Sequence, residues 1–213
     1  MKYGESTFDI LYLLFAIISG IYMLIKAKDK TGKAMGLAAL ILGLGDSFHL
    51  VPRVLNYFIN SDFSTALGVG KLVTSVTMTI FYIIMFYIWI VLYKEKYNVK
   101  LSVVVTILAL LRIIICLFPQ NGWFDNTSNL TWSLARNIPF TILGIIIVVL
   151  FYQKRNEEKT LRNVWLYVLL SFAFYIPVAI GASYVPMLGM LMLPKTICYI
   201  LMLVAFLNYI KNN

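Results

Sequence analysis

The chain has 213 residues, of which 61% are hydrophobic and 13% are charged, and its formal net charge is +9 at neutral pH. This composition excludes an ordinary soluble domain, in which about half of the residues are apolar and about a quarter are charged. The positive charge does not indicate nucleic-acid binding, because no soluble region combines basic and aromatic residues into a platform. The sequence predicts an all-α integral membrane protein.

Seven apolar runs approach or exceed the roughly 20 residues that a helix needs to cross a bilayer. They cover residues 7–27, 34–58, 67–93, 101–118, 132–153, 161–182 and 187–210. The first run lacks the basic segment and the small-residue cleavage site of a signal peptide, so we interpret it as a permanent helix. The connections are too short to hold a further domain. We therefore predict a single transmembrane domain, residues 1–213, that forms a seven-helix bundle.

Basic residues concentrate in alternate connections of this predicted bundle. Residues 26–33, 94–100 and 153–162 are rich in lysine and arginine, whereas the connections near residues 60 and 125 are poor in them. Twelve of the 18 lysines and arginines fall on the side of the basic connections, counting Lys211, and only Lys2 falls in a segment on the other side. Because basic loops remain in the cytoplasm, we predict an outer N-terminus and a cytoplasmic C-terminus in the cell membrane.

Seven ionisable side chains remain after the charges of the loops and ends are set aside. They are Asp46, His49, Arg53, Lys71, Arg112, Arg136 and Lys195. Such groups at membrane depth are costly, and they usually face an interior cavity or one another. At a rise of about 1.5 Å per residue, all seven lie at the midplane or in the outer half. In this interpretation five cations face a single carboxylate, that of Asp46, and the surplus indicates a missing anion.

Helical periodicity groups these residues into the walls of one pocket. Within the stretch GLGDSFHLVPR, Asp46, His49 and Arg53 share a helix face, Pro52 is expected to kink the helix, and the glycines at 43 and 45 allow a neighbouring helix to approach. Other walls are predicted from polar residues next to the remaining cations or next to prolines. These further residues are Ser75, Asn137, Tyr175 and Tyr199.

Each charge also has a structural interpretation. Arg53, Lys71 and Arg136 lie close enough to helix ends to extend toward the outer headgroups. Asp46 is too deep for that and would instead pair with Arg112, Lys195 or Arg53. His49 would then be a hydrogen-bonded residue of the core.

Several membrane families share features with this chain, which looks most like a seven-helix bacterial integral membrane protein. Residues 43–46, GLGD, resemble the Gly-Asp of lysoplasmalogenase-type membrane enzymes, which cleave the vinyl-ether bond of lysoplasmalogens with acidic residues on more than one helix. The helix number and the outer N-terminus resemble the ceramidase and adiponectin-receptor superfamily, but its zinc site needs several histidines and this chain has only His49. Lys195 in the last helix is similar to the Schiff-base lysine of rhodopsins, although Leu191 replaces the carboxylate expected one turn earlier.

The leading functional prediction is a polar pocket in the outer half that binds an anionic lipid or a small anionic ligand. Its contacts would come from Arg53, Lys71, Arg112 and Arg136, with Asp46, His49 and Lys195 as a deeper coupled group. An intramembrane lipid hydrolase or transferase, with Asp46 or His49 as general base, is the alternative, and a retinal-type photoreceptor through Lys195 is a minor one. We expect membrane lipids as partners and no metal, cofactor or nucleic acid. Sensor, carrier and lipid-binding protein remain open, as does the oligomeric state.

Overall fold

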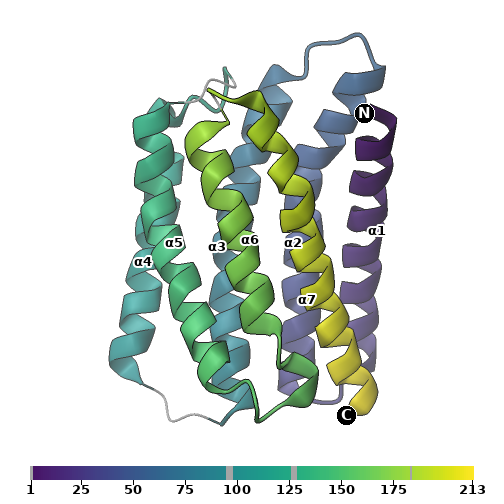
Figure 1. Cartoon of the computed structure of the whole chain (residues 1–213), viewed down its shortest axis with the longest axis vertical. Helices are drawn as coiled ribbons and strands as arrows, with labels where there is room; N and C mark the ends of the chain where they lie inside the picture. Colours follow the sequence, from purple (N-terminus) through teal and green to yellow (C-terminus); the bar gives the residue numbers. More distant parts are fainter. Residues whose placement is uncertain (1, 95–97, 126–128, 183) are drawn as a thin grey trace.

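Figure 1 shows the computed structural model of the chain, an up-and-down bundle of long helices. The structure describes residues 2–94, 98–125, 129–182 and 184–213. In these ranges it contains seven α-helices and three short 3₁₀ segments: α1 (Lys2–Lys26), α2 (Lys30–Phe58), α3 (Ser64–Leu92), α4 (Val99–Leu117), η1 (Pro119–Asn121), α5 (Leu130–Gln153), η2 (Lys159–Leu161), α6 (Val164–Gly181), η3 (Pro186–Leu191) and α7 (Met192–Asn212). Seven helical spans are long and apolar enough to cross a membrane. The predicted all-α bundle of seven helices is confirmed, and its helices fit a multi-pass membrane protein.

Two helices start five residues away from the predicted boundary. α7 begins at Met192 and not at residue 187, because the preceding residues form η3, and α1 begins at Lys2 and not at residue 7, so Glu5 lies in its first turn. The polar first turn interrupts the apolar run by which a membrane helix is recognised in a sequence. An acidic residue in this position nevertheless favours the helix, because it interacts with the positive end of the helix dipole.

Consecutive helices run in opposite directions and pack side by side, and α1 also contacts α7, which closes the ring. α3 contacts α2, α4 and α5. We call the end of the bundle that holds the N-terminus the N-end and the opposite end, which holds the C-terminus, the C-end (Figure 1). The three basic connections lie at the C-end, although residues 95–97 of the second one are outside the described ranges.

Small residues let α2 pack closely against both of its sequence neighbours. A Cβ atom on Gly43 would lie 3.0 Å from side-chain atoms of α1, and one on Gly45 would collide with Thr77 of α3. Both predicted close approaches are therefore confirmed. A third one was not predicted: a Cβ atom on Gly70 of α3 would collide with the carbonyl oxygen of Phe48. Pro52 lacks the N–H that would bond this carbonyl within α2, so α3 packs against a carbonyl that the helix leaves free.

The close-packed core lies in the C-end half. The helices there bury large apolar side chains completely, including Phe81 and Met85 of α3 and Phe206 of α7. Toward the N-end, four of the same helices change character. Four segments, all within the described ranges, contain no buried residue: 46–58 of α2, 71–77 of α3, 173–181 of α6 and 192–194 of α7. The ionisable residues predicted to lie at membrane depth all belong to the N-end half, although Arg112 and Lys195 are themselves buried.

Candidate anion-binding site

Arg112 is the most deeply buried cation in the bundle's described part. It lies on the inner face of α4, its side chain is 2% exposed, and its Nε and Nη1 atoms have no hydrogen-bond partner. The central carbon of its guanidinium lies 3.2 Å from the ring centroid of Phe140 on α5. A cation–π contact of this kind contributes about 2 kcal/mol when it is desolvated, whereas burying an unpaired ion costs several kcal/mol. Arg112 therefore has donors to spare for an oxyanion.

Lys195 is a second buried cation, and it lies in the first turn of α7. Its Nζ atom lies 5.3 Å from the ring centroid of Tyr175 and 5.2 Å from that of Tyr199. Among the described residues it has neither a hydrogen-bond partner nor a direct ion pair. Its electrostatic neighbours are Asp46, Arg112 and Arg53. Two aromatic faces thus hold the ammonium group and leave its three N–H donors available.

An aromatic wall connects the two cations. The rings of Phe140 and Tyr175 meet edge to face with their centroids 6.0 Å apart, so Arg112 and Lys195 lie over neighbouring members of one cluster. The Tyr175 hydroxyl donates to Oδ1 of Asn137 at 2.7 Å. Five of the predicted site residues therefore belong to one connected group, namely Arg112, Asn137, Tyr175, Lys195 and Tyr199.

Arg136 lies nearer the N-end and is held by neutral partners. Its Nη1 donates to Oδ1 of Asn121 at 2.6 Å, and its guanidinium lies 4.6 Å from the ring centroid of Trp123. Asn121 is buried, and its Nδ2 donates to the carbonyl of Ile115 at the end of α4. Sequence reasoning missed the part played by Asn121 and Trp123. Both lie in a short polar connection, where no periodic pattern distinguishes a buried residue from an exposed one.

Arg53 differs from these cations because the protein itself supplies its counter-charge. Its Nη1 lies 3.1 Å from Oε1 of Glu5 and 3.8 Å from Oδ2 of Asp9, both on α1. The Tyr57 hydroxyl donates to the other oxygen of Glu5 at 3.0 Å. A guanidinium engaged in this way has little remaining capacity for a ligand, contrary to the expected role of Arg53.

The prediction that Asp46 is the only carboxylate at membrane depth is wrong. Asp9 is 4% exposed and lies inside the first predicted apolar run, and Glu5 joins it in the longer α1. The signal was present in the sequence, because positions 5, 9 and 12 lie on one face of a helix. The cations still exceed the acids, but Arg53 no longer contributes to the surplus.

His49 contacts the protein through both ring nitrogens. Nδ1 lies 3.4 Å from the carbonyl oxygen of Leu67, and Nε2 lies 3.3 Å from Nη2 of Arg53. A carbonyl only accepts and a guanidinium only donates, so both contacts require the neutral ring with its proton on Nδ1. The Nε2 lone pair is then used by Arg53. This arrangement agrees with the hydrogen-bonded structural interpretation of His49 and leaves it without a free lone pair for a general base.

Asp46 accepts a hydrogen bond from the Tyr12 hydroxyl of α1, at 2.6 Å from Oδ2. Its electrostatic neighbours include Lys195 and Arg53, but none of the three cations predicted as its partner forms a direct ion pair with it in the described part of the chain. A hydroxyl-to-oxygen distance of 2.6 Å is typical of a bond to an ionised carboxylate. Sequence reasoning missed Tyr12, although it shares one face of α1 with Glu5 and Asp9.

The two remaining predicted residues, Lys71 and Ser75, lie apart from this group on α3. The Lys71 side chain is exposed. The Ser75 hydroxyl donates to the backbone carbonyl of Lys71 at 2.8 Å, so it is used within its own helix. Both residues lie in the N-end half of α3, and we call them the rim of the site.

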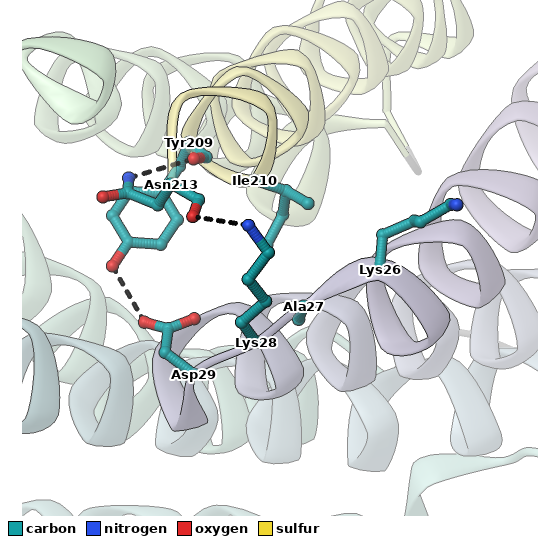
Figure 2. Close-up of a pocket in the computed structure, with 7 residues that line it drawn as sticks. All are labelled: Lys26, Ala27, Lys28, Asp29, Tyr209, Ile210 and Asn213. Atoms are coloured by element: carbon teal, nitrogen blue, oxygen red, sulfur yellow. Dashed lines mark hydrogen bonds between the residues drawn. The ribbon is translucent and has the colours of Figure 1, made fainter.

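A cavity of about 240 Å³ lies at the opposite end of the bundle, where the end of α7 meets the α1–α2 connection (Figure 2). The Tyr209 hydroxyl donates to Asp29 at 2.9 Å, and Lys28 donates to the carbonyl of Asn213 at 3.3 Å. Asp29 also accepts from the backbone N–H of Gly32 and so caps α2. The hydrogen bonds around this cavity connect the end of α7 to the start of α2. Among the described residues that line it, none is a buried charge without a partner, as Arg112 is.

Comparison of the chain with family models, with curated proteins and with solved structures gives no match. Within the described residues, no three histidine, cysteine, aspartate or glutamate side chains lie together as the ligands of a metal ion. The geometry of the residues themselves is therefore the basis of the functional argument.

Proposed function

We propose that this protein binds an anionic ligand, a lipid or a small molecule, between the helices of its N-end half. Arg112 and Lys195 supply the main contacts, and Arg136 lies closer to the N-end. The observation that carries the proposal is the environment of Arg112, a guanidinium that is 2% exposed with two nitrogens unpartnered.

The physical argument is the cost of such a group. An unpaired ion in a protein interior costs several kcal/mol, and the contact with Phe140 offsets only about 2 kcal/mol. Arg136 has neutral partners, and Lys195 has only aromatic faces and a more distant Asp46. An oxyanion between these groups would satisfy the spare donors and balance the charge. Arginine is well suited to this role, because its planar fork can bind carboxylate or phosphate through two bonds.

In this proposal the protein lies in the cell membrane with its N-end outside. The support is the separation of charge along the bundle, with the basic connections at the C-end. Cysteine variants Asp62→Cys and Lys28→Cys test it, because a membrane-impermeant maleimide should label position 62 in intact cells and position 28 only after lysis. The native Cys116 and Cys198 are buried and give the unlabelled background. Labelling with the opposite pattern would reverse the orientation.

The hydrolase alternative has less support. Arg53 occupies the His49 lone pair, and Asp46 bonds to Tyr12 and not to His49. No pair of neighbouring acid and base groups is formed by these residues. The resemblance of residues 43–46 to lysoplasmalogenase-type enzymes therefore rests on the sequence alone.

Binding can be measured on protein purified in a neutral detergent. Native mass spectrometry would compare phosphatidylglycerol, which is anionic, with phosphatidylcholine, which has no net charge. We expect wild type to retain phosphatidylglycerol selectively and Arg112→Gln to lose most of that selectivity, by at least tenfold in affinity.

Arg155→Gln is the matched control. Arg155 also lies over an aromatic ring, with its guanidinium 4.0 Å from the Tyr152 centroid, but it lies at the C-end. Its substitution should leave binding unchanged. Equal anion binding by wild type and Arg112→Gln would overturn the proposed function.

A further inference from the structure

We propose that Asp46 makes the site selective for a ligand with a single negative charge on an apolar body, such as a carboxylate or phosphodiester amphiphile. This inference rests on the proposed function and deepens it, because it assigns the charge and the chemical class of the ligand. It also gives Asp46 the role of a specificity-determining residue.

The argument begins with the charges of the deep group. Arg112 and Lys195 are cations, and Asp46 is an electrostatic neighbour of Lys195. The short bond from the Tyr12 hydroxyl is typical of an ionised carboxylate. The three side chains together therefore carry one positive charge. A monoanion neutralises them, whereas a dianion would leave an uncompensated negative charge in a poorly solvated site.

Neighbouring charges do not alter this balance in favour of a dianion. Glu5 and Asp9 lie against Arg53, so the α1–α2 cluster adds no net positive charge. Arg136 is bound to Asn121, lies in the second turn of α5 and is only half-buried, so water and salt screen it more strongly. Lys71 is exposed at the rim. The charge that a deeply bound ligand meets is consequently that of the deep group.

The walls of the site define the rest of the ligand. Arg112 lies over Phe140, and Lys195 lies between the faces of Tyr175 and Tyr199. Phe140 also packs against Phe172 at a centroid distance of 4.9 Å. An anionic group that reaches the two cations is surrounded by aromatic carbon. An apolar body next to the anionic group matches these surroundings, whereas a fully hydrated ion would lose its water there.

The test uses two amphiphiles with the same tail, methyl decyl phosphate and decyl phosphate, at pH 8.5. The first is a phosphodiester with one negative charge. The second is a monoester whose second pKa is about 6, so it carries two charges. Dimethyl phosphate, which has one charge and no tail, distinguishes an amphiphile from a small free anion. Affinities are measured by calorimetry on the full chain in a neutral detergent.

We expect wild type to bind methyl decyl phosphate at least tenfold more tightly than decyl phosphate, and dimethyl phosphate more weakly than either. Asp46→Asn raises the charge of the deep group by one, so it should abolish or reverse the preference between the two amphiphiles. Asp46→Glu keeps the charge and should keep the preference. Asp9→Asn is the matched control. It also removes a buried carboxylate, but one that faces Arg53 and not the deep group, so the preference should remain.

Two results would overturn this inference while leaving the proposed function intact. One is equal binding of the two amphiphiles by wild type, a measurement that needs no variant to fold. The other is an unchanged preference in Asp46→Asn. Failure of the proposed function looks different, because wild type would then bind none of the three phosphates, or Arg112→Gln would bind them as well as wild type does.

Discussion

In the C-end half of the bundle Phe81, Met85 and Phe206 are completely buried, whereas in the N-end half residues 71–77 of the same α3 all retain accessible surface. Two buried hydroxyl groups and the buried charged groups also differ between the halves. In or next to the close-packed core, buried Thr79 and Ser171 donate their hydroxyls to carbonyls of their own helices. Polar groups of that kind require nothing from outside the helix.

The buried charged residues of the N-end half require partners that their own helices do not supply. Asp9 depends on Arg53 across two helices, and Arg112 and Lys195 have aromatic faces but no counter-ion in contact with them. Packing in one half can thus hold the helices together while the other half retains costly groups. The difference indicates that stability comes mainly from the C-end half, whereas the binding that we propose takes place in the N-end half. Substitutions that are matched between the halves can break or sharpen this comparison.

The largest expected effect is the loss of packing in the C-end half. Phe206→Ala should lower the free energy of unfolding by about 3 kcal/mol, the lower end of the range for such truncations, because lipid can solvate part of the exposed surface. Phe174→Ala in the N-end half should cost clearly less, because Phe174 is only half-buried. Unfolding in mixed micelles measures both variants. Equal losses would remove the distinction between the halves.

The next effect concerns the ion-paired cluster of α1 and α2. Asp9→Asn should destabilise the protein by about 2 kcal/mol, below the 3–5 kcal/mol of a fully buried pair, because Glu5 still faces Arg53 and the Arg53 side chain is 26% exposed. In an Arg53→Met background the same substitution should cost less, because the Asp9 carboxylate then has no Arg53 charge to face. Thermal unfolding of the two single variants and the double variant provides the comparison. An equal cost of Asp9→Asn with and without Arg53 would contradict the pairing.

A smaller effect of opposite sign is expected at Arg112. Arg112→Met should raise the free energy of unfolding of the ligand-free protein by about 1 kcal/mol, because an apolar side chain of similar length removes the cost of a buried unpaired charge. Arg136→Met should instead destabilise it, since the Asn121 carbonyl loses its donor. Both variants are measured by thermal unfolding after delipidation. Destabilisation by Arg112→Met would mean that the protein itself satisfies Arg112.

The smallest effect is expected at the junction shown in Figure 2. Tyr209→Phe removes a single hydrogen bond to Asp29 and should cost about 1 kcal/mol. Because this junction belongs to the C-end half, anion binding should remain unchanged. Thermal unfolding and the binding of methyl decyl phosphate are measured on the same preparation. A loss of binding would show that the two halves are coupled.

The sequence predicted the helices well because each of them is an uninterrupted apolar segment. It predicted the site less evenly. Arg112, Lys195, Tyr175, Tyr199 and Asn137 were selected for their polarity at membrane depth, and the structure places them in one connected group. Their partners on apolar positions, such as Tyr12 and Phe140, could not be selected in this way. Glu5 was missed because the polar start of α1 was taken as a boundary, and Asp9 was missed although it lies inside the predicted run.

The sequence by itself determined the seven spans, their alternation and the separation of basic residues along the bundle, because all three depend on composition within a single segment. Only the tertiary structure decided which charges are neutralised. Arg53 and Arg112 have the same side chain at similar depth, yet Arg53 meets the carboxylates of α1 and Arg112 meets the face of Phe140. Electrostatic energy depends on distances between helices, and no pattern within one helix contains those distances.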